Sequence, residues 1–129
     1  LAESYRAMGE SEGLQKDAYA KAIPLAKARL EINDQDWRTH GMLATYYANS
    51  ERGDDALRET EVALDISKRN PEALLYAALV FNALGDQETT LTTLEEMVEA
   101  NNTFRLYAAN EPDLRSLSGN ERFDRLIHP

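Results

Sequence analysis

Two consecutive stretches of the chain carry apolar and polar residues in the same helical order. Residues 37–70 align with residues 71–104 without a gap, and small or apolar positions coincide with small or apolar positions. In both stretches these positions recur at spacings of three and four, the period of one helix face. Gly53-Asp54 and Gly85-Asp86 interrupt this period near the middle of each stretch. The pattern predicts an all-α fold in which helix–turn–helix units repeat every 34 residues.

The unit 37–70 is expected to begin just after Asp34 or Asp36. Either side chain suits a helix N-cap, because its oxygen accepts a bond from a free backbone N–H. Each of the two helices in this unit is predicted to bury one stripe of small or apolar residues. The buried positions are His40, Leu43, Ala44 and Tyr47 in the first helix, and Ala56, Leu57, Thr60, Ala63 and Leu64 in the second.

The unit 71–104 opens with Asn70-Pro71, a capping residue followed by the residue that fits the first helical turn. Gly85-Asp86 marks the turn between its two helices, and Asn101-Asn102 ends the second one. The predicted buried positions are Leu74, Ala77, Ala78 and Phe81, then Leu91, Leu94, Met97 and Val98.

Residues 1–36 repeat the pattern incompletely. Ala22, Ile23, Ala26 and Leu30 match the second helix of the later units. Residues 1–9 match the back half of a first helix, which leaves a spacer at residues 10–17 before a second helix beginning near Ala20. In the other interpretation a single helix begins near Leu14, and Pro24 kinks it.

Residues 105–129 depart from the period. The sequence predicts a short helix through Leu106 and Tyr107, then a turn at residues 110–114 leading into another short helix. Phe123, Leu126 and Ile127 form a last amphipathic segment. Because the last unit of a stack needs an atypical element over its apolar side, we interpret this tail as a cap. The expected organisation is one domain over 1–129, with units 1–36, 37–70, 71–104 and the cap 105–129.

The repeated positions resemble the tetratricopeptide repeat, a 34-residue unit with apolar or small residues at fixed places and often Gly at its fifteenth position. Residues 71–104 have Gly85 at that position, whereas residues 37–70 have Glu51 there. Residues 1–36 keep Leu1, Ala2, Tyr5 and Gly9 before the register breaks. The resemblance covers roughly residues 1–102. It implies a right-handed superhelix of stacked antiparallel helix pairs, about three repeats followed by a capping helix.

The end of the chain is similar to the finish of repeat domains attached to bacterial signalling proteins. The segments that carry this likeness are residues 110–117, Asn-Glu-Pro-Asp-Leu-x-x-Leu, and residues 122–127, Arg-Phe-x-x-Leu-Ile. Such proteins include protein kinases, nucleotide cyclases and winged-helix transcription activators. The likeness implies an accessory module of a larger regulator. The chain also lacks an initiator Met, and we expect it to be part of a longer protein.

The tetratricopeptide resemblance implies that the first helix of each unit lines a concave groove for an extended peptide or a helix. Groove-facing residues without any ligand are the alternative interpretation. The family's clamp for acidic C-terminal tails uses Lys and Asn, and only Asn49 fits it, so Leu75 and Leu79 favour a ligand with apolar anchors. The candidate partner-binding residues are Arg6, Arg38, Thr45, Asn49, Glu72, Leu75, Leu79 and Asn82.

Charge and composition narrow the classes of partner. The net charge of −9 argues against nonspecific binding to nucleic acid. Residues 71–104 hold six acidic and no basic side chains, which we interpret as a solvated helix face or as a docking surface for a basic partner. No apolar run reaches the roughly 18 residues of a membrane span, so we expect no membrane contact by this segment.

No motif predicts catalysis, a cofactor or a metal site. The chain has no cysteine, and its two histidines, His40 and His128, lack the spacing of a metal pair. His40 falls on a core-facing position, where a packed imidazole is expected. No glycine turn of the kind found in calcium loops accompanies Glu95, Glu96 and Glu99. We interpret these three residues as a solvated helix face. The sequence therefore predicts a scaffold for protein or peptide binding. The alternative is a sensory or self-association module, including a homodimer; a small enzyme would need residues that the sequence does not offer.

Overall fold

The computed structural model describes the backbone of residues 2–129 and the side chains of residues 15–129. Within these residues the chain is all-helical, as the sequence predicted, and contains no strand. The helices are α1 (Ala2–Ile32), α2 (Trp37–Ala48), α3 (Gly53–Ser67), α4 (Pro71–Ala83), α5 (Gln87–Ala100), α6 (Phe104–Asn110), the 3₁₀ helix η1 (Pro112–Leu117) and α7 (Glu121–Ile127). None of the described helices combines the length and the apolarity that a bilayer crossing requires.

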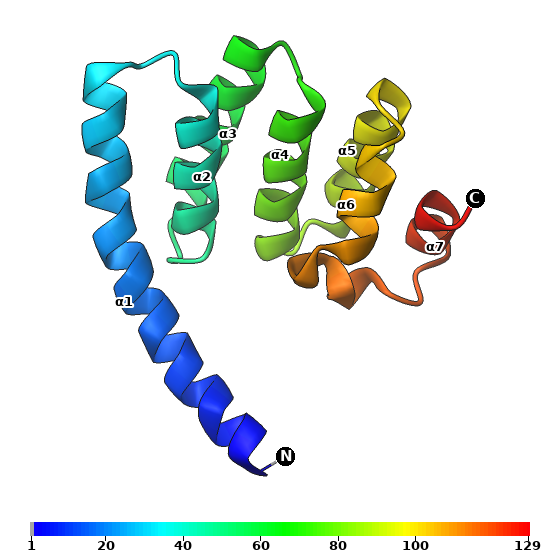
Figure 1. The fold of residues 1–129 in the computed structure, drawn as a ribbon, viewed down its shortest axis with the longest axis horizontal. Helices are drawn as coiled ribbons and strands as arrows, with labels where there is room; N and C mark the ends of the chain where they lie inside the picture. The colour runs from blue at the N-terminus through cyan, green and yellow to red at the C-terminus, as the bar shows by residue number, and fades with distance from the viewer. Residues whose placement is uncertain (1) are drawn as a thin grey trace.

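The central helices form two hairpins that lie side by side. α2 packs against α3, and α4 packs against α5. Figure 1 shows α2, α4 and α6 as a row, with α3 and α5 on the other side of that row. The row is continuous because α2 also packs on α4, and α4 contacts α6. One face of the molecule is therefore built by α2, α4 and α6.

Three side-chain caps set where the central helices begin. The Asp36 carboxylate accepts hydrogen bonds from the backbone N–H of Thr39, at 3.2 Å, and from its hydroxyl, at 2.6 Å. Asp86 makes the same pair of bonds with Thr89 at the start of α5. Asn70 caps α4, where its side-chain oxygen accepts from the N–H of Glu72 at 2.9 Å. These bonds satisfy N–H groups that a helix leaves without a partner. Of the two predicted caps of α2, Asp36 is the one used.

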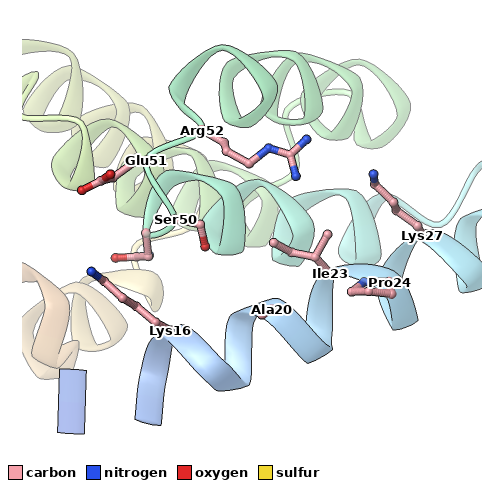
Figure 2. A pocket seen from close by; sticks show the side chains of 9 residues that line it. Lys16, Ala20, Ile23, Pro24, Lys27, Ser50, Glu51 and Arg52 are labelled. Atoms are coloured by element: carbon pink, nitrogen blue, oxygen red, sulfur yellow. The ribbon is translucent and has the colours of Figure 1, made fainter. Parts of the chain in front are cut away.

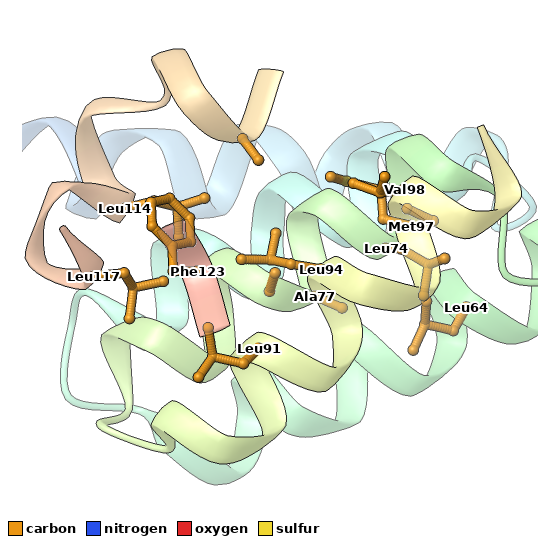
Figure 3. Close-up of a cluster of buried hydrophobic side chains, with 13 residues drawn as sticks. Leu64, Leu74, Ala77, Leu91, Leu94, Met97, Val98, Leu114, Leu117 and Phe123 are labelled. Atoms are coloured by element: carbon orange, nitrogen blue, oxygen red, sulfur yellow. The ribbon is translucent and has the colours of Figure 1, made fainter. Parts of the chain in front are cut away.

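The core lies between the hairpins and continues under the C-terminal cap (Figure 3). The predicted stripes are buried at most positions, including Leu43, Tyr47 and Leu74, whereas Phe81 is half-buried at the edge of the core. The prediction was wrong for Leu57, which is 41% exposed. In α3 the neighbouring Ala56 faces the core, and successive residues of a helix point about 100° apart. The larger cluster comprises Leu64, Ala73, Leu74, Ala77, Ala78, Leu91, Leu94, Met97, Val98, Ala108, Leu114, Leu117 and Phe123.

The N-terminal segment corrects the predicted first unit. Neither the spacer at residues 10–17 nor a helix start near Leu14 is found, because α1 runs without a break from Ala2 to Ile32. Residues 10–23 hold no proline, and half of them are Ala, Glu or Lys, which are good helix formers, so the helix continues through them despite Gly13. Pro24 lies inside α1, and the helix is bent along its length (Figure 1). Ile23 and Ala26 are buried, as predicted.

The tail forms the short elements that the sequence predicted. α6, η1 and α7 follow one another after α5, and their apolar side chains enter the larger core cluster. Leu114, Leu117 and Phe123 are almost completely buried. Figure 3 shows these three side chains gathered near Leu91 and Leu94 of α5. The tail therefore covers apolar surface that the second hairpin leaves open.

Candidate functional site

The row of α2, α4 and α6 carries six of the eight candidate partner-binding residues, and a seventh, Asn49, directly follows α2. Arg38 of α2 and Glu72 of α4 are ion-paired across this face, with Nε donating to Oε2 at 2.8 Å and Nη2 to Oε1 at 3.3 Å. The bond to Glu72 raises the pKa of Arg38. The Arg38 guanidinium also lies 4.6 Å from the centre of the Trp37 ring. Both predicted residues are thus engaged with each other at one end of the row.

α2 and α4 approach closely because Gly41 has no side chain. A Cβ atom at Gly41 would lie 2.8 Å from Cδ2 of Tyr76, inside van der Waals contact. The Tyr76 ring therefore occupies the place of the missing side chain. Burial raises the pKa of Tyr76, and the Glu72 carboxylate adds to this effect.

A cleft of about 370 Å³ opens between α4 and α6. Its apolar walls come from Leu75, Leu79, Phe104 and Tyr107, together with the ring of Tyr76. Two carboxylates, Glu72 and Glu111, complete the lining. On α6, Leu106 is 66% and Tyr107 is 55% exposed, so apolar surface continues outside the cleft. Leu75 and Leu79, two predicted groove residues, lie together here.

A smaller pocket adjoins this cleft through Leu79. It has a volume of about 130 Å³ and brings together Thr45, Asn49 and Asn82, three further predicted residues, with Ala83 and Asp113. The side-chain amides of Asn49 and Asn82 both donate hydrogen bonds to backbone oxygens of this chain. Asn82 Nδ2 donates to the backbone oxygen of Asp113 at 2.8 Å, which ties α4 to η1, and Asn49 Nδ2 donates to the backbone oxygen of Thr45. The last candidate, Arg6, lies outside the residues whose side chains the structure describes.

α1 closes the other side of this face. The rings of Tyr19 on α1 and Tyr46 on α2 lie 5.7 Å apart, so Tyr46 faces a neighbouring helix. Burial raises the pKa of Tyr19, and the Asp113 carboxylate raises it further.

Sequence reasoning missed the aromatic side chains of the cleft. Tyr76 stands next to the predicted Leu75, whereas Phe104 and Tyr107 belong to the segment interpreted as a cap. The available signal was the pair of aromatic residues at spacing three in residues 104–107, one turn of a short helix. Their rings lie 4.9 Å apart. α6 therefore acts as a wall of the cleft as well as a cap.

Arginines from neighbouring elements pair with most of the acidic side chains of residues 71–104. Arg69 holds Glu96 through two bonds of 2.6 and 2.7 Å. Arg122 of α7 holds Glu88 and Glu95 of α5, at 2.7 and 2.6 Å. These bonds lower the pKa of Glu95 and of Glu96. The acidic surface thus serves first to join elements of the fold.

His40 is packed in the interior, as predicted. Its Nδ1 lies 2.5 Å from the Glu59 carboxylate on α3, and its Nε2 lies 2.8 Å from the backbone oxygen of Asp34. The ring therefore links α2 to α3 and to the turn before α2.

A larger cavity, of about 730 Å³, lies between α1 and the turn that joins α2 to α3. Figure 2 shows Ile23 pointing from α1 towards α2, with Lys16 and Lys27 at either end of the same stretch of α1. Arg52 reaches in from the turn (Figure 2). The lining residues are Lys16, Ala20, Ile23, Pro24, Lys27, Asn49, Ser50, Glu51 and Arg52. Sequence reasoning missed this cavity, because it depends on how α1 lies against the turn between α2 and α3.

Comparison of the sequence with protein-family models gave no match, and a search of curated proteins found none similar to it.

Proposed function

We propose that this chain is a tetratricopeptide-like scaffold whose α2–α4–α6 face binds an extended segment of a partner protein. The observation that carries the proposal is the aromatic and leucine-lined cleft between α4 and α6, which continues through Leu79 into a polar pocket. Clefts of this composition suit peptides, because apolar pockets take side-chain anchors while polar groups take the peptide backbone.

The spacing of the helices supports the repeat assignment. α4 begins at Pro71, 34 residues after α2 begins at Trp37, and α5 begins at Gln87, 34 residues after Gly53 begins α3. Equivalent helices are also joined: the Arg38–Glu72 pair links residues 34 apart. A stack of such units presents its first helices on one side, which in this chain is the side with the cleft.

Leu79→Glu tests the proposal, because Leu79 lines both parts of the face. Peptides are first selected from a random display library for binding to the parent chain, and their affinities for the variant are then measured by calorimetry. We expect the charge in the apolar cleft to weaken binding at least tenfold, about 1.4 kcal/mol or more.

Val62→Glu is the matched control, since it places the same charge on a partly exposed apolar position of α3. It should leave peptide affinity unchanged. Circular dichroism establishes that both variants remain folded. If the selected peptides bind the Leu79→Glu variant as tightly as they bind the parent chain, the binding site lies elsewhere.

A second candidate function, self-association within a larger regulator, is favoured by one observation. Leu25 and Ile32 on α1 are 68% and 89% exposed. Large apolar side chains on an outward helix face are typical of contacts between protein chains. Sedimentation velocity over a range of concentrations distinguishes the two functions. A dimer that the substitution Leu25→Glu dissociates would support self-association. A chain that stays monomeric at every concentration would exclude self-association.

A further inference from the structure

We infer that the cavity between α1 and the α2–α3 turn is a second binding site, and that it takes a small amphipathic anion, an apolar body carrying one carboxylate. The peptide-binding proposal uses a different part of the molecule, and Asn49 is the one residue that lines both this cavity and the small polar pocket beside the cleft. Its volume of about 730 Å³ is that of a small-molecule pocket, for which the usual range is about 300–1,000 Å³.

The wall formed by α1 is apolar along its middle. Ile23 and Pro24 come three and four residues after Ala20, so all three lie on the side of α1 that lines the cavity. An alkyl or aryl group placed here would leave water for a surface of carbon atoms.

The charged residues that line the cavity favour a negatively charged ligand. The lining contains three cationic side chains, Lys16, Lys27 and Arg52, and one carboxylate, Glu51, although the net charge of the whole chain is −9. A local excess of positive charge in an acidic molecule attracts anions to this cavity rather than to the remaining surface. The two lysines lie at either end of the apolar stretch (Figure 2), so that a carboxylate at either end of the ligand has a cation to pair with.

Two of the three cations are held in place before any ligand arrives. The Arg52 guanidinium lies 4.3 Å from the centre of the Tyr47 ring, and Lys27 Nζ lies 5.9 Å from the same ring. Arg52 also donates from Nε to Asp55 at 2.9 Å. Fixed cations lose less conformational freedom on binding than free side chains do. Arg52 is already paired with Asp55. The larger part of the attraction for an anion therefore comes from Lys16 and Lys27.

The experiment is a titration of the ¹⁵N-labelled chain with octanoate, followed by NMR. Octylammonium serves as the probe of opposite charge with the same alkyl body. We expect saturable shifts of the amides of Ala20, Ile23, Ser50 and Glu51 with octanoate, and weaker, unsaturated shifts with octylammonium. Equal responses to the two probes, or octanoate shifts confined to other amides, would overturn the inference.

Charge variants test the part played by the lysines. Lys16→Gln and Lys27→Gln should each weaken octanoate binding about threefold to fivefold, in line with one partly exposed ion pair. Lys21→Gln is the matched control, because Lys21 is an exposed lysine of the same helix that does not line the cavity. A loss of affinity as large in Lys21→Gln would show nonspecific attraction and would also overturn the inference.

The outcome is separable from that of the peptide proposal. Leu79 does not line this cavity, and Leu79→Glu should leave octanoate affinity unchanged while it weakens the selected peptides.

Discussion

Gly41 lies where α2 comes closest to α4, and the ring of Tyr76 fills the space that a side chain would take. The spacing of the two helices that build the proposed binding face therefore depends on the absence of one methyl group. The need for a glycine at this position is evident only from its contact with Tyr76.

Gly41→Ala should destabilise the chain by about 1–2 kcal/mol, because the new methyl group overlaps Tyr76. At an open helix position the same change would stabilise by up to about 1 kcal/mol, so the sign of the effect is informative. The measurement is the free energy of unfolding in urea. Gly53→Ala is the control, since its Cβ would lie 3.4 Å from Leu84, an ordinary contact.

A double-mutant cycle makes this test specific. In a Tyr76→Ala background the ring no longer opposes the methyl group, and Gly41→Ala should cost much less than in the parent. An equal cost in both backgrounds would mean that the two helices are not spaced by this contact.

Among the helices, the two hairpins were predictable from the sequence and α1 was not. Caps such as Asp36 and Asn70, and turns such as Gly85, act over a few residues and leave a clear local signal. In residues 10–17 the expected break rested on a count of residues against a repeat length, but no proline stands there and the helix continues through Gly13. The expected register therefore did not determine where this helix begins.

The residues of the candidate site divide in the same way. Leu75 and Leu79 were found because they occupy regular positions in a repeated helix. Phe104 and Tyr107 belong to the segment that departs from the period, and their place in the cleft follows from how α6 docks against α4. A single sequence carries no direct signal for docking of that kind.

Besides the packing of Phe123, one residue of α7, Arg122, joins α7 to α5 by pairing with two acidic side chains. Arg122 donates to Glu88 and to Glu95, and it also bonds the hydroxyl of Thr92 at 3.0 Å. Arg122→Ala should speed amide hydrogen exchange throughout α7 while leaving α2 to α5 protected, because α7 is a short terminal helix. Arg115→Ala, at an exposed position of η1, is the control. Unchanged exchange in α7 would show that burial of Phe123 alone holds it.

At the scale of the whole molecule, ion pairs and caps make stability depend on pH. The pKa values of Asp36, Asp55, Asp86, Glu95 and Glu96 lie below their ordinary values of 3.8 for Asp and 4.5 for Glu, chiefly through side-chain hydrogen bonds to Thr or Arg. The folded chain therefore binds fewer protons than the unfolded chain in acid. The resulting stability is fully present above the ordinary values and is lost as pH falls through the lower, folded values.

The urea midpoint should accordingly hold steady between pH 7 and pH 5, then fall steeply below about pH 4. Arg122→Ala should make the acid loss shallower, because Glu95 would titrate nearer its ordinary value. A midpoint that is as high at pH 3 as at pH 7 would contradict the hydrogen bonds described for these carboxylates.

The central claim is that α2, α4 and α6 together present one face that holds a partner segment. The most direct test is an NMR titration of the ¹⁵N-labelled chain with a peptide selected as above, with binding mapped by amide shifts. The account predicts that the largest shifts fall on Leu75, Leu79 and Tyr107 and extend to Thr45 and Asn82. Shifts concentrated on the outer faces of α3 and α5, with the cleft residues unmoved, would contradict it.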